Sequence, residues 1–389
     1  MTKTESKARF NNADEALYLK RFENLMESFK TGGKPAPYDT LEAVLGTSDY
    51  QPLNKAIDSP PPEFVLSVRD YAQNHNSTAL IIWHDGKIIE ESYFGEVNQN
   101  TLITSLSLAK PLSVIAVGRA IQQGFIPSLD VPIAEFISEW QGSEKNQIRL
   151  EHILRMSSGL LPQAMATTAD DVLNRAYLHP RHDEVIFHEY PLTHEPGSRY
   201  EYSNANGELV APILERATGK RYAQWLGEMV LQPLGAKGGE VFVNRPGGTA
   251  HSGCCILLPA DSYLRLALLV LNDGAWQGQR LLPEDFVKTM CTASRTNAQA
   301  GMGLYIGQQY SERRGFGNPE TMPEHLKTYH SEPYLADDLV LFDGNQNQVA
   351  YIVPSKKLVI LRVGERTLKK PEWDNSFLPN TILRGLKLQ

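Results

Sequence analysis

The chain has 389 residues, 41% of them hydrophobic, and a formal net charge of −7 from 38 Lys and Arg against 45 Asp and Glu. This apolar fraction is enough for a folded core and excludes a disordered chain. The acidic balance and the lack of long basic runs argue against a nucleic-acid partner. The longest apolar run is far shorter than the ~20 residues of a membrane-spanning helix, so no membrane partner is expected. The three cysteines exclude a disulfide scaffold and fit no zinc motif.

The hydrophobic periodicity predicts the elements in chain order. An amphipathic helix is expected over 13–30, within an amino-terminal extension, 1–57, that ends near a Pro-rich break. A strand pair is expected over 79–93, because Asp85-Gly86 separates two β-rich runs. Helices are expected over 112–123, 207–218 and 261–272, a second strand pair over 349–363, and a closing helix over 373–386.

Strands near both ends, with helices between them, predict one sheet built from the two ends of the chain. We expect an α/β (α+β) protein in which 58–120 and 296–389 form an α/β lobe and 121–295 form a mainly helical lobe. The first twelve residues carry no secretory-signal pattern, so the expected compartment is the cytoplasm, or the periplasm for a processed form. The sequence leaves the compartment and the oligomeric state open.

The sharpest chemical feature is Ser107-Leu108-Ala109-Lys110, followed by the apolar helix from Leu112. Positions i and i+3 share one face of a helix, so the Lys110 amine can lie beside the Ser107 hydroxyl. A serine becomes a good nucleophile when a neighbouring base takes its proton, and a lysine can be that base if burial or nearby positive charge lowers its pKa. The alternative is a helix cap followed by a surface lysine.

A second feature is Tyr202-Ser203-Asn204, which follows a turn and precedes the helix expected from Gly207. A tyrosine can pass a proton between a nucleophile and a leaving group, and an asparagine amide can orient a lysine and a substrate carbonyl. Alone, this motif is equally well explained by a core tyrosine and a helix-capping asparagine.

Together, in this order and about 95 residues apart, the two motifs resemble those of the serine β-lactamase and penicillin-binding superfamily. The resemblance is to the class C-like branch, with its family VIII carboxylesterases and 6-aminohexanoate-dimer hydrolases. It extends over 79–363, and its supporting segments are 104–110, 124–130, 148–160 and 196–204. It implies a β-lactamase-like fold, an antiparallel sheet flanked by helices plus an all-helical lobe, with the site between them and no cofactor or metal. The roles it implies are catalytic for Ser107, Lys110 and Tyr202 and orienting for Asn204.

The family's third motif, a Lys/His-Thr/Ser-Gly triplet near the carboxyl end, is replaced here by 344–348, Gly-Asn-Gln-Asn-Gln. Asn345 and Gln348 can bind a substrate through neutral amides, whereas the family's lysine binds a carboxylate. This departure favours an uncharged ester or amide over a β-lactam. A backbone N–H near Gln348 or Val349, with that of Ser107, is expected to hold the oxyanion.

Two weaker expectations concern the remaining candidate residues. His251 can face the cleft, or it can be a structural hydrogen-bonding residue, while Cys254 and Cys255 are predicted to be small buried residues. The histidines in 170–194 have no spacing that matches a known metal motif, so no metal is expected.

The sequence therefore predicts a serine hydrolase that acts on a small ester or amide through a Ser107 acyl-enzyme. One alternative is a β-lactamase or D-alanyl-D-alanine carboxypeptidase with the same mechanism. A second alternative is a non-catalytic binding protein on the same fold, because fold alone does not fix function.

Overall fold

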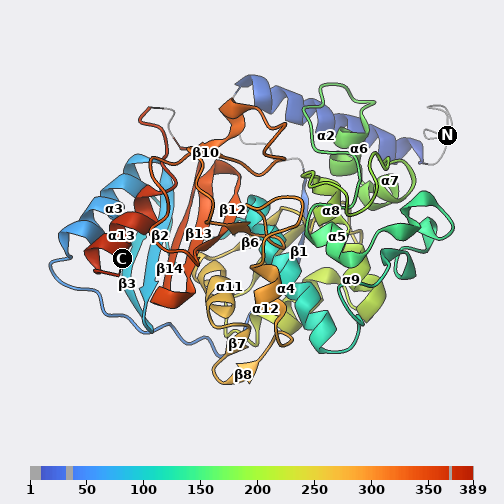
Figure 1. Ribbon diagram of the computed structural model, residues 1–389. Helices are drawn as coiled ribbons and strands as arrows, with labels where there is room; N and C mark the ends of the chain where they lie inside the picture. Colours follow the sequence, from blue (N-terminus) through green and yellow to red (C-terminus); the bar gives the residue numbers. More distant parts are fainter. Residues whose placement is uncertain (1–9, 32–37, 368–369, 389) are drawn as a thin grey trace.

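The computed structural model describes residues 10–31, 38–367 and 370–388, and a six-stranded antiparallel sheet dominates one side of the molecule (Figure 1). Its strands, in spatial order, are β3 (Lys87–Tyr93), β2 (Ser77–His84), β14 (Leu358–Gly364), β13 (Gln348–Val353), β12 (Val340–Gly344) and β9 (Tyr305–Ile306). A smaller sheet contains β1 (Thr40–Val44), β5 (Gly239–Val243), β6 (Ile256–Leu258) and β4 (Ile103–Thr104). Two short strand pairs are β7 (Ala275–Trp276) with β8 (Gln279–Arg280), and β10 (Arg313–Arg314) with β11 (Thr328–Tyr329).

Helices cover both faces of the large sheet and form most of the opposite side of the molecule. The helices next to the large sheet are α3 (Glu63–Asn74), α13 (Phe377–Gly385), α11 (Ala260–Leu271) and α4 (Ala109–Gln122). The others are α2 (Asn12–Thr31), α5 (Leu150–Leu154), α6 (Val172–Leu178), α7 (His182–His188), α8 (Asn204–Glu208), α9 (Val210–Thr218), α10 (Tyr222–Leu226) and α12 (Phe286–Met290). None of the described helices is both long and apolar enough to cross a membrane.

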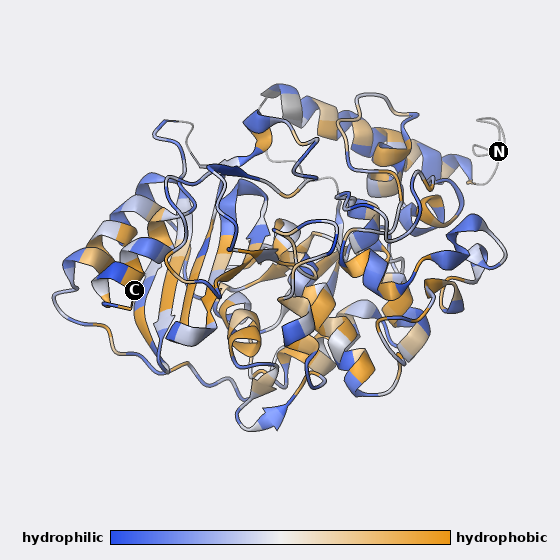
Figure 2. Cartoon of the chain, viewed as in Figure 1, coloured by the Kyte–Doolittle hydropathy of each residue, from blue (hydrophilic) through white to orange (hydrophobic). Residues whose placement is uncertain are grey.

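Strand β2 shows why the sheet is covered on both faces. Its alternate residues enter different clusters, because Leu80 and Ile82 pack with α3 and α13 while Ala79 and Ile81 pack with α4 and α11. A strand buried on both faces has a continuous apolar sequence, as this one does. Figure 2 shows the same distribution, with apolar strands and an apolar α11 at the centre of the molecule.

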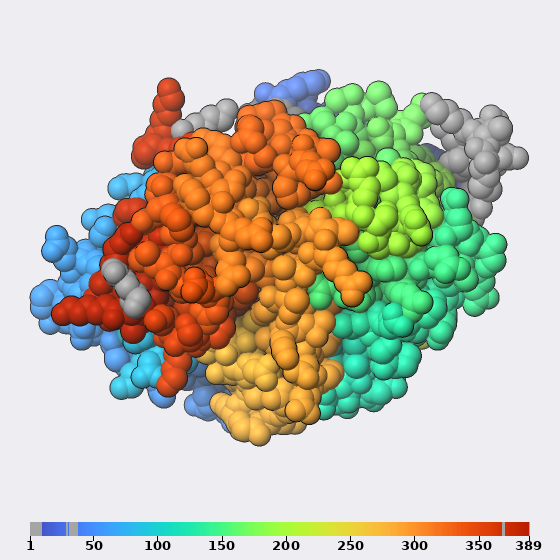
Figure 3. Space-filling model, in the orientation of Figure 1, coloured from blue at the N-terminus to red at the C-terminus, as the bar shows by residue number. Residues whose placement is uncertain are grey.

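The predicted elements are present close to their expected limits. Strands β2 and β3 pair across the Asp85-Gly86 turn, and β13 pairs with β14. The helix expected over 207–218 divides into α8 and α9, and α8 already begins at Asn204. The predicted α/β class, with an antiparallel sheet flanked by helices, is confirmed. Strand β14 pairs with β2, and Figures 1 and 3 show α3, β2 and β3 (light blue) beside β14 and α13 (red) on the left.

The lobe limits 58–120, 121–295 and 296–389 stay a prediction, and contacts of several elements cross them. Helix α11 lies within 121–295 yet packs against β13 and β14 of the large sheet. From the extension, 1–57, β1 pairs with β5 and α2 contacts α6, so the described part of this extension is tied to the rest of the fold. Residues 1–9 and 32–37 of the extension lie outside the described residues.

Candidate active site

Ser107 lies on a tight turn between strand β4 and helix α4. The turn is a short 3-10 helix over Leu106–Leu108, and α4 follows directly at Ala109. Leu106 has a φ of 47°, in the left-handed region that a branched side chain rarely adopts. The turn therefore holds the serine in a fixed, partly exposed position at the amino end of an apolar helix.

Lys110 lies on the first turn of α4, and only 7% of it is exposed. Its Nζ atom lies 3.1 Å from Ser107 Oγ, 2.8 Å from the carbonyl oxygen of Gly253 and 3.4 Å from Asn204 Oδ1. An ammonium group would use all three hydrogens on these acceptors. A neutral amine would donate to the two amide oxygens and present its lone pair to the serine hydroxyl, so the geometry accommodates both protonation states.

Tyr202 approaches Ser107 from the segment that precedes α8. Its hydroxyl lies 2.8 Å from Ser107 Oγ, and its ring lies 4.9 Å from Lys110 Nζ. Asn204 begins α8, which places its amide beside Lys110. The structure thus brings together the four residues that the two sequence motifs singled out, although they come from segments far apart in the chain.

The pocket in front of Ser107 is mostly apolar and aromatic, with one carboxyl that the sequence analysis missed. Its lining residues are Ser107, Lys110, Leu154, Met156, Tyr200, Tyr202, Ala300, Gly301, Gly303, Leu304, Tyr305 and Asp343. Burial raises the pKa of Asp343 to about 7, although Arg314 acts in the opposite direction. The Arg314 guanidinium donates to the carbonyl oxygens of Gly307 and Ile306, so it already has partners.

The strand beside the Ser107 turn is β12, and it ends at Gly344. A Cβ atom at this position would lie 3.3 Å from Ser107 N and 3.1 Å from Leu108 N, so glycine permits the close approach. The motif predicted at 344–348 starts one residue after Asp343, which is the residue that lines the pocket. The sequence signal that could have identified Asp343 is an aspartate followed by a glycine at the end of an apolar strand.

The two amides predicted to bind substrate lie elsewhere around this strand end. Asn345 is exposed, and its Oδ1 accepts a hydrogen bond from Gln346 N. Gln348 is only 2% exposed, and its Nε2 donates to the carbonyl oxygen of Thr104 at 2.9 Å. The Gln348 side chain thus connects β13 to β4, the strand that precedes the Ser107 turn. Neither Asn345 nor Gln348 is among the residues that line the pocket.

His251 is fully buried away from the pocket, beside Glu208 and His182. Its Nδ1 lies 3.3 Å from Glu208 Oε2, and its ring stacks on His182 at 4.2 Å between ring centres. Burial alone would raise the pKa of Glu208, but His251 and His182 lower it to about 2. Burial lowers the pKa of His251 to about 4.

The same three residues have the composition of a metal site, but their hydrogen bonding argues against one. Asn244 Oδ1 accepts from Thr249 N, so its Nδ2 faces His182 Nδ1 at 3.0 Å and donates to it. The hydrogen of neutral His182 is then on Nε2, which faces Glu208 Oε2 at 3.5 Å. A metal ligand needs a free lone pair at that nitrogen and an acceptor for the other one. The arrangement fits a buried carboxylate with a histidine at ion-pair distance on each side.

Cys254 and Cys255 are joined by a disulfide bond, which the sequence analysis did not predict. Cys255 is buried, as predicted, whereas Cys254 is partly exposed. The signal that was available, two adjacent cysteines, does not reveal whether the chain brings the sulfur atoms together. The backbone here supports the site directly, because Gly253 O accepts from Lys110 and Cys254 O accepts from Ser105 Oγ at 2.9 Å.

A comparison of the sequence with known families decides the class. The family described as Beta-lactamase matches residues 61–372, which is most of the chain. The chain belongs to this family. The resemblance read from the order of the two motifs is thereby confirmed, and so is the predicted β-lactamase-like fold.

The relatives of this chain include proteins named as an esterase and as a 6-aminohexanoate-dimer hydrolase. The chain is 22% identical over 243 residues to the 6-aminohexanoate-dimer hydrolase of Paenarthrobacter ureafaciens, which covers 58% of this chain and 60% of that protein. It is 29% identical over 155 residues to Esterase EstB of Burkholderia gladioli, covering 36% and 38%. The solved structure of a putative 6-aminohexanoate-dimer hydrolase from Bacillus anthracis superposes with a TM-score of 0.70 at 16% identity, over 94% of both chains. The last similarity shows the fold.

Proposed function

We propose that this member of the beta-lactamase family is a serine hydrolase that cleaves a small ester or amide through an acyl group on Ser107. One observation carries the proposal: the hydroxyl of Tyr202 and the amine of Lys110 both lie within hydrogen-bonding distance of Ser107 Oγ, at 2.8 and 3.1 Å. Two potential proton acceptors on one hydroxyl are what an activated serine requires.

In the proposed reaction, Ser107 Oγ attacks the substrate carbonyl carbon while its proton passes to Tyr202 or Lys110. The oxyanion is held by the N–H of Ser107 and by an N–H from the end of β12, the strand that Gly344 brings against the turn. The tetrahedral intermediate collapses, and the leaving alcohol or amine takes the proton. Water then attacks the acyl-serine, loses a proton to the same pair, and releases the acid with the serine restored.

The charge of the pocket supports a substrate that carries no carboxylate next to the reacting carbonyl. Asp343 lines the pocket, and Arg314 is held by backbone carbonyl oxygens. Lys110 has three oxygen neighbours of its own. Neither of these two cations is free to pair with a substrate carboxylate beside Asp343, which favours a neutral ester or amide over a β-lactam.

The test is covalent labelling with a fluorophosphonate, followed by ester turnover. Wild-type protein should incorporate one label and hydrolyse a short-chain p-nitrophenyl ester, and Ser107→Ala should do neither. Ser198→Ala, a change at an exposed serine outside the pocket, is the control and should behave as wild type.

Either of two outcomes would contradict the proposal and favour a different function. Turnover of a chromogenic cephalosporin much faster than that of the ester would favour a β-lactamase or a D-alanyl-D-alanine carboxypeptidase. Failure of all acylating probes to label the folded protein would favour a non-catalytic binding protein.

A further inference from the structure

The backbone of the short segment 253–256 contacts Lys110 and the turn that carries Ser107, while its two sulfur atoms face the other way. Gly253 O accepts from Lys110 Nζ at 2.8 Å, and Cys254 O accepts from Ser105 Oγ at 2.9 Å. Ile256 completes the contact, because its N–H donates to Ser105 Oγ at 3.2 Å and its carbonyl oxygen accepts from Ser105 N at 2.7 Å. The position of both the lysine and the turn that carries Ser107 therefore depends on this segment.

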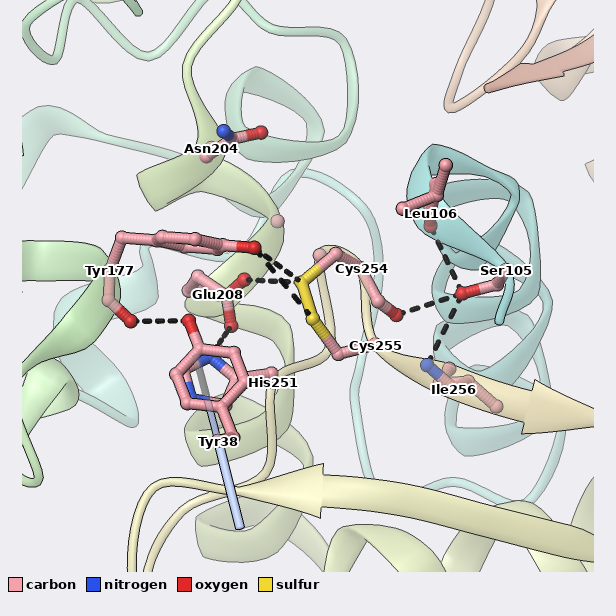
Figure 4. The surroundings of a disulfide bond; sticks show 12 residues. Tyr38, Ser105, Leu106, Tyr177, Asn204, Glu208, His251, Cys254, Cys255 and Ile256 are labelled. Atoms are coloured by element: carbon pink, nitrogen blue, oxygen red, sulfur yellow. Dashed lines mark hydrogen bonds and ion pairs between the residues drawn. A yellow bond between two sulfur atoms is a disulfide. The ribbon is translucent and has the colours of Figure 1, made fainter. Parts of the chain in front are cut away.

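The sulfur side of the segment faces a polar environment that suits thiols as well as a disulfide. Tyr177 Oη lies 3.8 Å from Cys254 Sγ and 4.0 Å from Cys255 Sγ, and Glu208 Oε1 lies 3.9 Å from Cys254 Sγ. Figure 4 shows these groups on one side of the disulfide and Ser105 on the other. A disulfide has no hydrogen to give to Glu208, whereas a Cys254 thiol would find an acceptor there. Both oxidation states thus have partners.

We propose that Cys254 and Cys255 form a thiol–disulfide exchange site whose state controls the reactivity of Ser107. A dithiol reductant attacks Cys254, the more exposed of the two, and the thiolate of Cys255 leaves. The second thiol of the reductant then breaks the mixed disulfide and releases Cys254. The protein gains two electrons and two protons, and the reductant becomes a disulfide.

The backbone gives the link from the sulfur atoms to the serine. Cys255 has a φ of 40°, in the left-handed region, where a residue other than glycine stays only when its surroundings hold it. The covalent ring through Cys254 and Cys255 is one such restraint. When it opens, Cys255 can return to an ordinary conformation, and the carbonyl oxygens of Gly253 and Cys254 move away from Lys110 and Ser105.

The first test counts thiols and needs no enzymatic activity. The denatured protein, after equilibration with oxidised dithiothreitol, should show one reactive thiol, Cys291, and three after equilibration with the reduced reagent. Reduced native protein should also bind phenylarsine oxide, which bridges neighbouring thiols, and Cys254→Ala/Cys255→Ala should not. Three thiols after oxidation, or no arsenical binding after reduction, would overturn the site.

The second test measures control of the serine and rests on the proposed function. Across a series of reduced and oxidised dithiothreitol mixtures, the rate of fluorophosphonate labelling should fall at least tenfold on reduction and recover on oxidation. Cys291→Ser should respond as wild type, while Cys254→Ala/Cys255→Ala should be slow under all conditions. An unchanged rate in wild type would overturn the control.

A readout that does not depend on labelling separates this inference from the proposed function. The amides of Ser105 and Ile256 should exchange hydrogen for deuterium at least tenfold faster in the reduced protein, because their mutual bonds loosen. Absence of labelling in both states, with this change in exchange, would reject the hydrolase and retain the exchange site as a control of the turn. Equal exchange in the two states would overturn the coupling itself.

Discussion

Replacing Tyr202 by phenylalanine tests whether this residue transfers a proton or only positions Ser107. The change removes the hydroxyl that lies 2.8 Å from Ser107 Oγ and keeps the ring, which packs edge-on against Phe316 at 4.8 Å between ring centres. Fold and pocket shape should therefore be preserved. What is lost is one hydrogen bond and, if the proposed reaction holds, one acid–base group.

The two roles differ in magnitude. A hydrogen bond alone contributes about 0.5–1.5 kcal/mol, so its loss lowers kcat by no more than about tenfold. General acid–base catalysis contributes about 10²–10⁴-fold, equivalent to roughly 3–5.5 kcal/mol. We expect Tyr202→Phe to lower kcat for a p-nitrophenyl ester at least 100-fold, with the melting temperature within a few degrees of wild type.

Tyr200→Phe is a matched control for this change. Tyr200 lines the same pocket, and its hydroxyl donates a hydrogen bond of the same length, 2.8 Å, to the carbonyl oxygen of Phe316. It has no contact with Ser107 Oγ among the hydrogen bonds of the described chain, so its loss should lower kcat less than tenfold. Similar, small losses in both variants would refute proton transfer by Tyr202 and leave Lys110 as the base.

Three further changes probe the surroundings of the site. Because the raised pKa of Asp343 makes the folded state bind more protons than the unfolded state, the free energy of unfolding should fall as pH rises from about 4 to 7. Asp343→Asn should remove that fall. In urea titrations the variant's free energy of unfolding should exceed that of wild type by about 2 kcal/mol at pH 8 and by little at pH 4.5. Gly344→Ala should lower kcat about tenfold with a small change in melting temperature, since its Cβ would press on the amide of Ser107; wild-type turnover would contradict the close approach. Arg362→Lys should lower the free energy of unfolding by about 3 kcal/mol, because a lysine cannot reproduce the bonds of the buried guanidinium to 346–347, and an equal unfolding midpoint would contradict this.

The part of the site that the sequence could predict is the part fixed by local spacing. Ser107 and Lys110 share a helix face, and Asn204 begins a helix, so their placement follows from steps of one to three residues. The fold class could be predicted for a similar reason, because continuous apolar runs such as 79–82 indicate which strands are buried on both faces.

The remaining features depend on contacts between distant segments. Gln348 looks like a polar residue near the site, but its strand turns it toward Thr104. His251 faces Glu208 because the 251–256 segment turns its backbone, and not its side chains, toward Lys110. Asp343 lines the pocket because β9 pairs only with 340–341 of β12, which leaves the end of β12 uncovered on that side. The local sequence does not indicate where a partner strand ends.

The pairing of β14 with β2 also determines when the large sheet can form during synthesis. Thr78 bonds to Val363, 285 residues later in the chain, and at translation rates of 5–20 residues per second the wait is roughly 15 to 60 s. Throughout that time the β2–β3 hairpin presents an apolar strand edge without a partner, a surface on which nascent chains associate. A middle strand of the sheet, β14, is thus the last to be synthesised. A chain truncated before Leu358 would keep Ser107, Lys110 and Tyr202 but lose the strand that joins β2 to β13.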